Sequence, residues 1–389
     1  MEELTRAVKR TNAWACYDCG KCTATCPIAR VGGSLSPRRH VLGANSGQVT
    51  SPGADGGLAA CLTCAQCEEG CPAEVRYTDL VLELRQMQGA RASEPECPHG
   101  GALQSMMRVM AKGATTQNRL GWLTPDLKVA ERTGPVFLWT GCTPYYDAFF
   151  PELGAATLNG TRAAVKVLNA LGITPVVSAD ERCCGHDLLW NGDRSGFEAL
   201  ARHNLELAAA SGAEIMVTPC AECLRTWVMD YPKLTRAKLP RPLHLSELVA
   251  ERLGELRFPG NGGRRVTFQD PCRLGRHLGI YEAPRKVLDA LPGVERVEMR
   301  RSGRRSLCCA GGTWSSCDRY AKKVQVDRLR EARATGAEVL VTACPKCQIH
   351  FLCAMKDPKL GAEIQIELRD LGEMVAAALT SEGKDSHGH

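Results

Sequence analysis

The chain has 389 residues, 44% of them hydrophobic, and a formal net charge of +6 from 49 basic and 43 acidic side chains. A chain of this length can bury a core unaided, which excludes the short secreted disulfide scaffolds that its 21 cysteines would otherwise suggest. The small basic excess is weak evidence for a nucleic acid partner, and no zinc-finger or helix-turn-helix pattern accompanies it.

The sequence also predicts the compartment. The first ten residues, MEELTRAVKR, are charged and lack the apolar stretch of a signal peptide, and no run approaches the roughly 18 apolar residues of a membrane span. We therefore expect a cytoplasmic protein without a membrane span of its own. In a reducing compartment, clustered cysteines indicate metal ligands rather than disulfide bonds.

Residues 1–90 contain one cysteine block twice, with the spacing C-x2-C-x2-C-x3-C-P of bacterial two-cluster ferredoxins. In those ferredoxins the fourth cysteine of each block binds the other cluster. The spacing therefore predicts two cubane 4Fe-4S clusters, the first held by Cys16, Cys19, Cys22 and Cys71, and the second by Cys26, Cys61, Cys64 and Cys67. Zinc is the alternative, but zinc sites commonly use pairs of C-x2-C. We expect a small, mostly helical N-terminal module, with a helix over 77–88.

Residues 91–134 are predicted to form a linker, with a loop, a helix over 102–114 and then a polar connection. From residue 135 onward, short apolar runs that end in cysteine alternate with amphipathic helices, which favours an open α/β fold with a largely parallel sheet. The expected strand segments are 135–142, 173–185, 214–223, 264–272, 294–312 and 338–347. The expected helices are 161–173, 197–213, 282–294 and 320–337.

A second kind of cysteine block occurs twice in this region: a single Cys, a Cys-Cys pair and a C-x-x-C. The two copies are Cys142, Cys183, Cys184, Cys220 and Cys223, and Cys272, Cys308, Cys309, Cys344 and Cys347. Equivalent cysteines lie 124 to 130 residues apart, which predicts two pseudo-symmetric half-domains, 135–255 and 256–380, before a flexible tail at 381–389.

Each cysteine group lies where a predicted strand ends, the edge at which open α/β sheets bind ligands, and helix N-termini there favour an anionic cluster. We therefore expect five thiolates to converge on one cofactor in each half. Five exceeds what one ordinary cube requires, and the adjacent cysteines of each pair point differently. A cluster bound by both should be distorted or opened.

These blocks resemble the cysteine-rich CCG domains of heterodisulfide reductase, as does QDPCRLGRHLGIYEAPR around Cys272. The front module resembles the small ferredoxin-like subunit of the same enzyme, so the chain is similar to the two subunits fused, over about residues 10–360. The resemblance implies a noncubane 4Fe-4S cluster on each set of five cysteines, giving four clusters in all. It also implies an oxidoreductase in which a disulfide is split between the two noncubane clusters by two one-electron steps.

The chain also resembles subunits that only conduct electrons, such as those linked to benzoyl-CoA reductase, sulfite reductase or hydroxy-acid dehydrogenases. A non-catalytic electron-transfer subunit is therefore the second hypothesis, and a zinc-stabilised interaction protein is the third. No Gly-rich dinucleotide fingerprint or Walker loop occurs, so flavin or nicotinamide chemistry must come from a partner subunit, and a membrane-bound partner stays open. The basic cluster at Arg300, Arg301, Arg304 and Arg305 is either a solvated loop or a docking patch.

His186 and His277 follow cysteines closely and are candidate proton donors to a departing thiolate, or else they tune the cluster through hydrogen bonds. His350 is a weaker candidate. Three cysteines outside the blocks, Cys97, Cys317 and Cys353, are predicted to be buried thiols rather than ligands.

Overall fold

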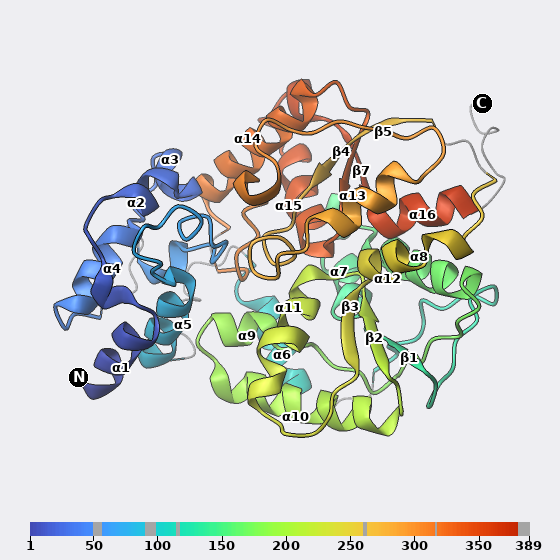
Figure 1. The fold of residues 1–389 in the computed structure, drawn as a ribbon, viewed down its shortest axis with the longest axis horizontal. Coiled ribbons are helices and arrows are strands. Elements are labelled where there is room, and N and C mark those ends of the chain that lie inside the picture. The colour runs from blue at the N-terminus through green and yellow to red at the C-terminus, as the bar shows by residue number, and fades with distance from the viewer. Residues whose placement is uncertain (50–56, 90–98, 114–116, 260–262, 316, 380–389) are drawn as a thin grey trace. The chain divides into compact units, whose positions relative to one another are not determined.

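The computed structural model describes residues 1–49, 57–89, 99–113, 117–259, 263–315 and 317–379 (Figure 1). The chain divides into two compact units. The first unit comprises 1–114, 185–200 and 304–328, and the second comprises 115–184, 201–303 and 329–389. Two segments that lie far along the sequence therefore belong to the same unit as the front module.

The first unit is built from short helices and the loops that carry its cysteines. Its helices are α1 (Glu2–Arg10), α2 (Lys21–Thr25), α3 (Pro27–Arg30), α4 (Pro37–Asn45), α5 (Tyr77–Gln88), α6 (Ala102–Lys112) and α9 (His186–Trp190). Helix α4 begins where the Ser36 hydroxyl accepts a hydrogen bond from the Arg39 amide (3.3 Å) and Pro37 occupies the first turn. Helices α1, α4 and α5 pack on one another. As expected, the described residues of 1–89 include no strand.

The second unit contains two parallel sheets, one in each half of the duplicated region. The strands are β1 (Val136–Leu138), β2 (Ile215–Thr218), β3 (Arg241–His244), β4 (Arg265–Gln269), β5 (Glu295–Arg296), β6 (Val339–Thr342) and β7 (Glu367–Asp370). The strand orders are β1-β2-β3 and β5-β4-β6-β7, and every pairing is parallel. The predicted α/β class with parallel strands is confirmed.

Helices cover these sheets and join the halves. They are α7 (Thr143–Phe149), α8 (Thr157–Ala170), α11 (Ala221–Met229), α12 (Leu245–Glu251), α13 (Glu282–Asp289), α15 (Pro345–Met355) and α16 (Leu371–Leu379). Two more, α10 (Arg194–Ala210) and α14 (Arg319–Ala334), begin in the first unit and end in the second. Helix α8 packs on α16, and α12 on α13, so helices of one half pack against helices of the other (Figure 1).

The core of the first half contains a cluster of buried aromatic side chains. The rings of Trp139 and Trp227 lie 5.1 Å apart, and those of Trp227 and Tyr231 lie 4.7 Å apart, measured between centroids. All three side chains are buried.

In the predicted strand segment 173–185, Val176 makes only isolated bridges to Phe137 and Ala130. Among the described residues, no helix is long and apolar enough to cross a membrane.

Candidate functional site

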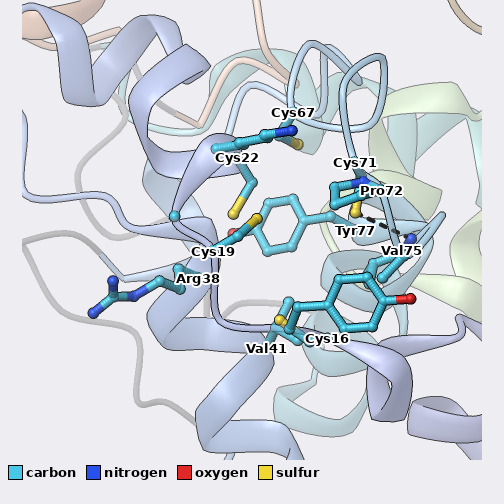
Figure 2. A pocket seen from close by; sticks show the side chains of 14 residues that line it. Cys16, Cys19, Cys22, Arg38, Val41, Cys67, Cys71, Pro72, Val75 and Tyr77 are labelled. Carbon is cyan, nitrogen blue, oxygen red and sulfur yellow. Dashed lines mark hydrogen bonds between the residues drawn. The ribbon is translucent and has the colours of Figure 1, made fainter.

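Three cysteines of the first block and two of the second line a cavity of about 440 Å³ in the first unit. Figure 2 shows the cysteine side chains that line this cavity: Cys16, Cys19, Cys22, Cys67 and Cys71. The loop turns sharply at Asp18 (φ 56°), which brings the Asp18 amide to 3.4 Å from Cys16 Sγ. The Val75 amide lies 3.4 Å from Cys71 Sγ. Backbone amides that point at sulfur favour a thiolate over a thiol.

The second block surrounds a smaller cavity of about 300 Å³. Its cysteines are Cys26, Cys61, Cys64 and Cys67, and all four are buried. Thr63 (φ 49°) repeats the turn of the first block, with its amide 3.4 Å from Cys61 Sγ. The structure therefore brings together, at each cavity, three cysteines of one block and the fourth cysteine of the other, and Cys67 lines both cavities.

Burial makes these thiols poor acids. Burial, together with the neighbouring Cys64 and Cys61, raises the pKa of Cys26 to about 12, and burial also raises the pKa of Cys67. A buried thiolate at these positions needs a cationic metal to compensate its charge. This donor set, four soft sulfur atoms around a cavity, fits an iron-sulfur cluster.

The first set of five cysteines lies wholly in the second unit, and all five are buried. Cys223 Sγ is 3.6 Å from Cys184 Sγ, and the Cys183 thiol is hydrogen-bonded to those of Cys142 and Cys184. These hydrogen bonds and burial raise the pKa of Cys183. A Cβ atom at Gly141 (φ +65°) would lie 2.8 Å from Cys223 Sγ, so this position requires glycine. Contacts between sulfur atoms therefore link the five thiols of this set, and their role as ligands of one cofactor stays a prediction.

The second set of five is divided between the units. Cys308 and Cys309 belong to the first unit, while Cys272, Cys344 and Cys347 belong to the second. Cys272 is half-buried and the other four are buried.

The C-x-x-C motifs of the two halves meet inside the second unit. Cys220 and Cys344 are the residues that precede α11 and α15, and their thiols are hydrogen-bonded to each other. Hydrogen bonds with Cys223 and Cys344 lower the pKa of Cys220 to about 6. The two cysteine sets are therefore in contact at Cys220 and Cys344.

A buried ion pair joins the same two motifs. Lys346 Nζ lies 2.7 Å from Glu222 Oε2, and the side chains are 2% and 11% exposed. The two residues occupy equivalent positions, each directly before the second cysteine of its C-x-x-C motif. The duplication has therefore placed opposite charges at one repeated position.

Buried charges also hold the loops around the single cysteines. Glu181 accepts hydrogen bonds from the amides of Thr140 (3.1 Å) and Gly141 (2.7 Å) and from Arg119 Nη2 (2.7 Å), directly before Cys142. Burial alone would lower the pKa of Arg119, but the facing Glu181 carboxylate outweighs it and raises that pKa. The guanidinium is therefore charged in the folded protein.

The second half uses a related arrangement. Asp270, two residues before Cys272, accepts hydrogen bonds from Arg285 Nη1 (2.7 Å) and Nη2 (3.1 Å) and from the Gly303 amide (2.9 Å). Both halves thus position the loop of the single cysteine with a buried carboxylate and an arginine.

The candidate histidines differ in their surroundings. His186 is buried in the first unit, with Nδ1 3.1 Å from the Asp187 carboxylate. Arg273 Nη1 lies 2.8 Å from Nε2 of His277 and 3.3 Å from its Nδ1. Since a guanidinium can only donate, the ring nitrogen that it contacts is an acceptor and cannot supply a proton. His350 is buried in α15. Catalytic roles for these residues stay predictions.

The remaining candidates lie outside the cysteine sets. Cys317 and Cys353 are half-buried, and Cys97 lies outside the described residues, as does the predicted tail at 381–389. The basic cluster is partly neutralised by acidic side chains, with Arg301 2.5 Å from Glu331 and Arg304 3.6 Å from Glu69.

His244 was not identified from the sequence, yet it links the two halves near the C-x-x-C motifs. It ends β3, where Nδ1 accepts a hydrogen bond from the Ser246 amide (3.1 Å) and Nε2 donates to the Ala343 carbonyl (3.2 Å). Burial lowers its pKa from 6.5 to about 4, despite hydrogen bonds to the carbonyls of Pro219 and Ala343. The duplicated cysteine pattern gives no signal for this residue, because it ends a strand that the sequence did not predict.

The neutral imidazole of His244 should make stability depend on pH. Between about pH 7.5 and about pH 5.5, unfolded His244 takes up a proton that the folded residue does not. The free energy of unfolding should therefore fall by roughly 1 kcal/mol through this residue as pH falls. Denaturant unfolding of the purified protein at both pH values measures the change. His244→Asn, which keeps a capping side chain, should show a smaller pH dependence. An equal pH dependence would contradict the assignment.

Comparison with known proteins gives both domain types. A family of 4Fe-4S dicluster domains matches residues 12–75, and a family of cysteine-rich domains matches 136–226 and again 266–352. These matches establish iron-sulfur clusters as the cofactors and show that the cysteine-rich domain occurs twice in the chain.

The curated relatives of this chain include subunits of two kinds of reductase. A subunit of the dihydromethanophenazine:CoB–CoM heterodisulfide reductase of Methanosarcina acetivorans is 30% identical, covering 96% of this chain and 95% of that protein. A subunit of the fumarate reductase (CoM/CoB) of Methanothermobacter marburgensis is 27% identical, covering 92% and 71%. A hypothetical protein from Helicobacter pylori has a similar fold, with a TM-score of 0.54 at 12% identity over 89% of this chain and 65% of that one.

Proposed function

Because this chain belongs to the family of that heterodisulfide reductase subunit, we propose that it reduces, or reversibly forms, a mixed disulfide of two small thiols at its duplicated cysteine-rich domain. It is an iron-sulfur oxidoreductase subunit. The relatives named above are subunits of reductase complexes, so a redox partner subunit supplies or accepts the electrons. The names of both relatives include CoM and CoB, so mixed disulfides of this pair are the first substrates to test.

The proposal assigns four clusters to four cysteine sets. Two cubanes would be held in the first unit, one by Cys16, Cys19, Cys22 and Cys71 and the other by Cys26, Cys61, Cys64 and Cys67. Two noncubane clusters would be held by the sets of five that begin at Cys142 and at Cys272. The cysteines that line the two cavities together, and the convergence of the five thiols around Cys184, support this assignment. Clusters bound in these sites would supply single electrons.

The contact between the two C-x-x-C motifs is the observation on which the proposed disulfide reduction mainly rests. Splitting one S–S bond takes two electrons and two protons and gives two thiols. If each cysteine set delivers one electron, both sets must lie within reach of the same disulfide. The hydrogen bond between Cys220 and Cys344 and the ion pair between Glu222 and Lys346 support that arrangement. A subunit that only conducts electrons does not need the two sets to be in contact.

The test begins with anaerobic purification and analysis of iron and sulfide. We expect about sixteen irons per chain, since four clusters of four irons follow from the four cysteine sets. The electron paramagnetic resonance (EPR) spectrum should gain a signal from the duplicated domain when CoM or CoB thiol is added to oxidised protein. If neither thiol nor their mixed disulfide changes the EPR spectrum, the result would contradict catalysis and favour a non-catalytic electron-transfer subunit. Stoichiometric zinc without sulfide would contradict both.

A single substitution tests the assignment to the duplicated domain. Cys184→Ala should lose or alter the thiol-induced EPR signal and leave the front cubane signals unchanged, because Cys184 belongs to the second unit and the cubane cysteines to the first. Cys353→Ala, a substitution of a half-buried cysteine outside the four sets, is the matched control and should retain full iron content. Loss of the front signals in Cys184→Ala would contradict the domain assignment.

A further inference from the structure

Two residues of the first unit line both of its cysteine cavities. Among the described residues, these are Cys67 and Tyr77. Cys67 belongs to the second cysteine set, which leaves Tyr77 as the shared wall residue that is not a proposed ligand. Figure 2 shows the Tyr77 ring among Cys19, Cys22 and Cys71. The ring therefore lies in the partition between the two cavities.

The orientation of Tyr77 is fixed from both sides. It is the first residue of α5, and only 3% of it is exposed. Its hydroxyl lies 2.6 Å from Nδ1 of His40, itself 4% exposed, and the two rings are stacked with an interplanar angle of 17°. Since each side chain is buried, the hydroxyl and the imidazole form a polar pair that water does not screen.

A fixed dipole in this position acts on whatever charge the two cavities hold. The Tyr77 hydroxyl, held 2.6 Å from Nδ1 of His40, presents its dipole beside both cavities, which the residue lines. Hydrogen bonding and solvent exposure are two of the factors that set the potentials of iron-sulfur clusters. An aromatic ring in the partition excludes water from it, and a hydroxyl held by His40 keeps its dipole in one direction.

We infer that Tyr77 is a positioning residue for electron transfer between the two cubanes: its ring separates the clusters and its hydroxyl, oriented by His40, sets their potentials. This inference rests on the proposed function in requiring that both cavities hold clusters. It goes beyond that function by assigning a role to two residues that are not ligands.

The experiment is a redox titration of the front clusters, followed by EPR, on anaerobically purified full-length protein. Tyr77→Phe removes the hydroxyl and keeps the ring. We expect its cubane midpoint potentials to shift while iron content stays at the wild-type value. Tyr320→Phe is the matched control, because Tyr320 belongs to the first unit but lines neither cavity, and it should leave both potentials unchanged.

A second substitution tests the pairing with His40. His40→Leu should also shift the potentials, and the double variant with Tyr77→Phe should shift them no further than Tyr77→Phe alone, because residues that act as one unit are not additive. Potentials of Tyr77→Phe equal to those of the wild type and of Tyr320→Phe, at full iron content, would overturn this inference alone. Absence of cubane signals from the wild-type protein would instead overturn the proposed function, and this inference with it.

Discussion

Lys346→Met is expected to lower the free energy of unfolding of the second unit by about 3–5 kcal/mol, since it leaves the Glu222 carboxylate buried without its cation. The side chain of Lys346 is 2% exposed and that of Glu222 is 11% exposed, so solvent cannot replace the lost partner. Because the pair joins the two C-x-x-C motifs, the variant should also alter the thiol-induced EPR signal. Denaturant unfolding under anaerobic conditions measures the first effect, and thiol titration measures the second.

Two variants separate loss of the charge pair from loss of packing. The double variant Glu222→Gln with Lys346→Met removes both charges and should recover most of the stability, since replacing both partners of a buried pair costs far less than removing one. Arg241→Met is the matched control, because it breaks an exposed pair with Glu251 and should change stability by less than about 1 kcal/mol. A double variant as unstable as Lys346→Met would show that the ion pair is not the cause.

Arg119→Met is expected to cost a similar amount, about 3–5 kcal/mol, and in addition to remove one cluster. Arg119 is 1% exposed and pairs with a Glu181 that is fully buried, and its Nη2 also donates to the carbonyl of Gly141. Without the guanidinium, the Glu181 carboxylate cannot stay charged while it holds the loop before Cys142. Iron should fall from about sixteen to about twelve per chain, with the cubane signals unchanged.

Lys166→Met provides the control for Arg119→Met. Lys166 forms an exposed pair with Asp126, so its loss should leave iron content and unfolding unchanged within about 0.5 kcal/mol. Full iron content in Arg119→Met would contradict the view that this pair positions Cys142, even if stability fell.

Much of this architecture could be predicted from the sequence because cysteine spacing and hydrophobic periodicity are local signals. The helix over 77–88 is observed as α5, from Tyr77 to Gln88. The predicted strands that precede Cys142, Cys220, Cys272 and Cys344 are all present as β1, β2, β4 and β6. The crossing of each fourth cysteine to the other cavity agrees with the spacing rule, although the clusters themselves stay a proposal.

Two strand-helix pairs were not predicted. Strand β3, with the sequence RPLH, and strand β7, with the sequence ELRD, are four residues each and mostly polar. They lie at sheet edges, where only one side pairs with another strand, so neither apolar alternation nor length is required of them. The sequence therefore gives no strand signal, and His244 at the end of β3 was missed with it.

The buried ion pairs could not be predicted from the sequence for a different reason. Arg119 lies in the segment predicted to be a polar linker, and its partner Glu181 is 62 residues away. A sequence displays charge but not the distance between two charges once the chain has folded. Likewise, residues 185–200 and 304–328 belong to the first unit although they lie within the duplicated region. The domain limits at 90, 134, 255 and 380 stay predictions.

The opposite charges at Glu222 and Lys346 bear on how this chain can assemble. A domain formed by duplication could in principle be replaced by two copies of one half, related by a twofold axis. Two first halves would then place Glu222 against Glu222, and two second halves would place Lys346 against Lys346, each burying like charges in contact. Pairing of one half with the other is therefore electrostatically favourable at this position, whereas pairing of two identical halves is not. The ion pair therefore disfavours an arrangement built from two identical halves.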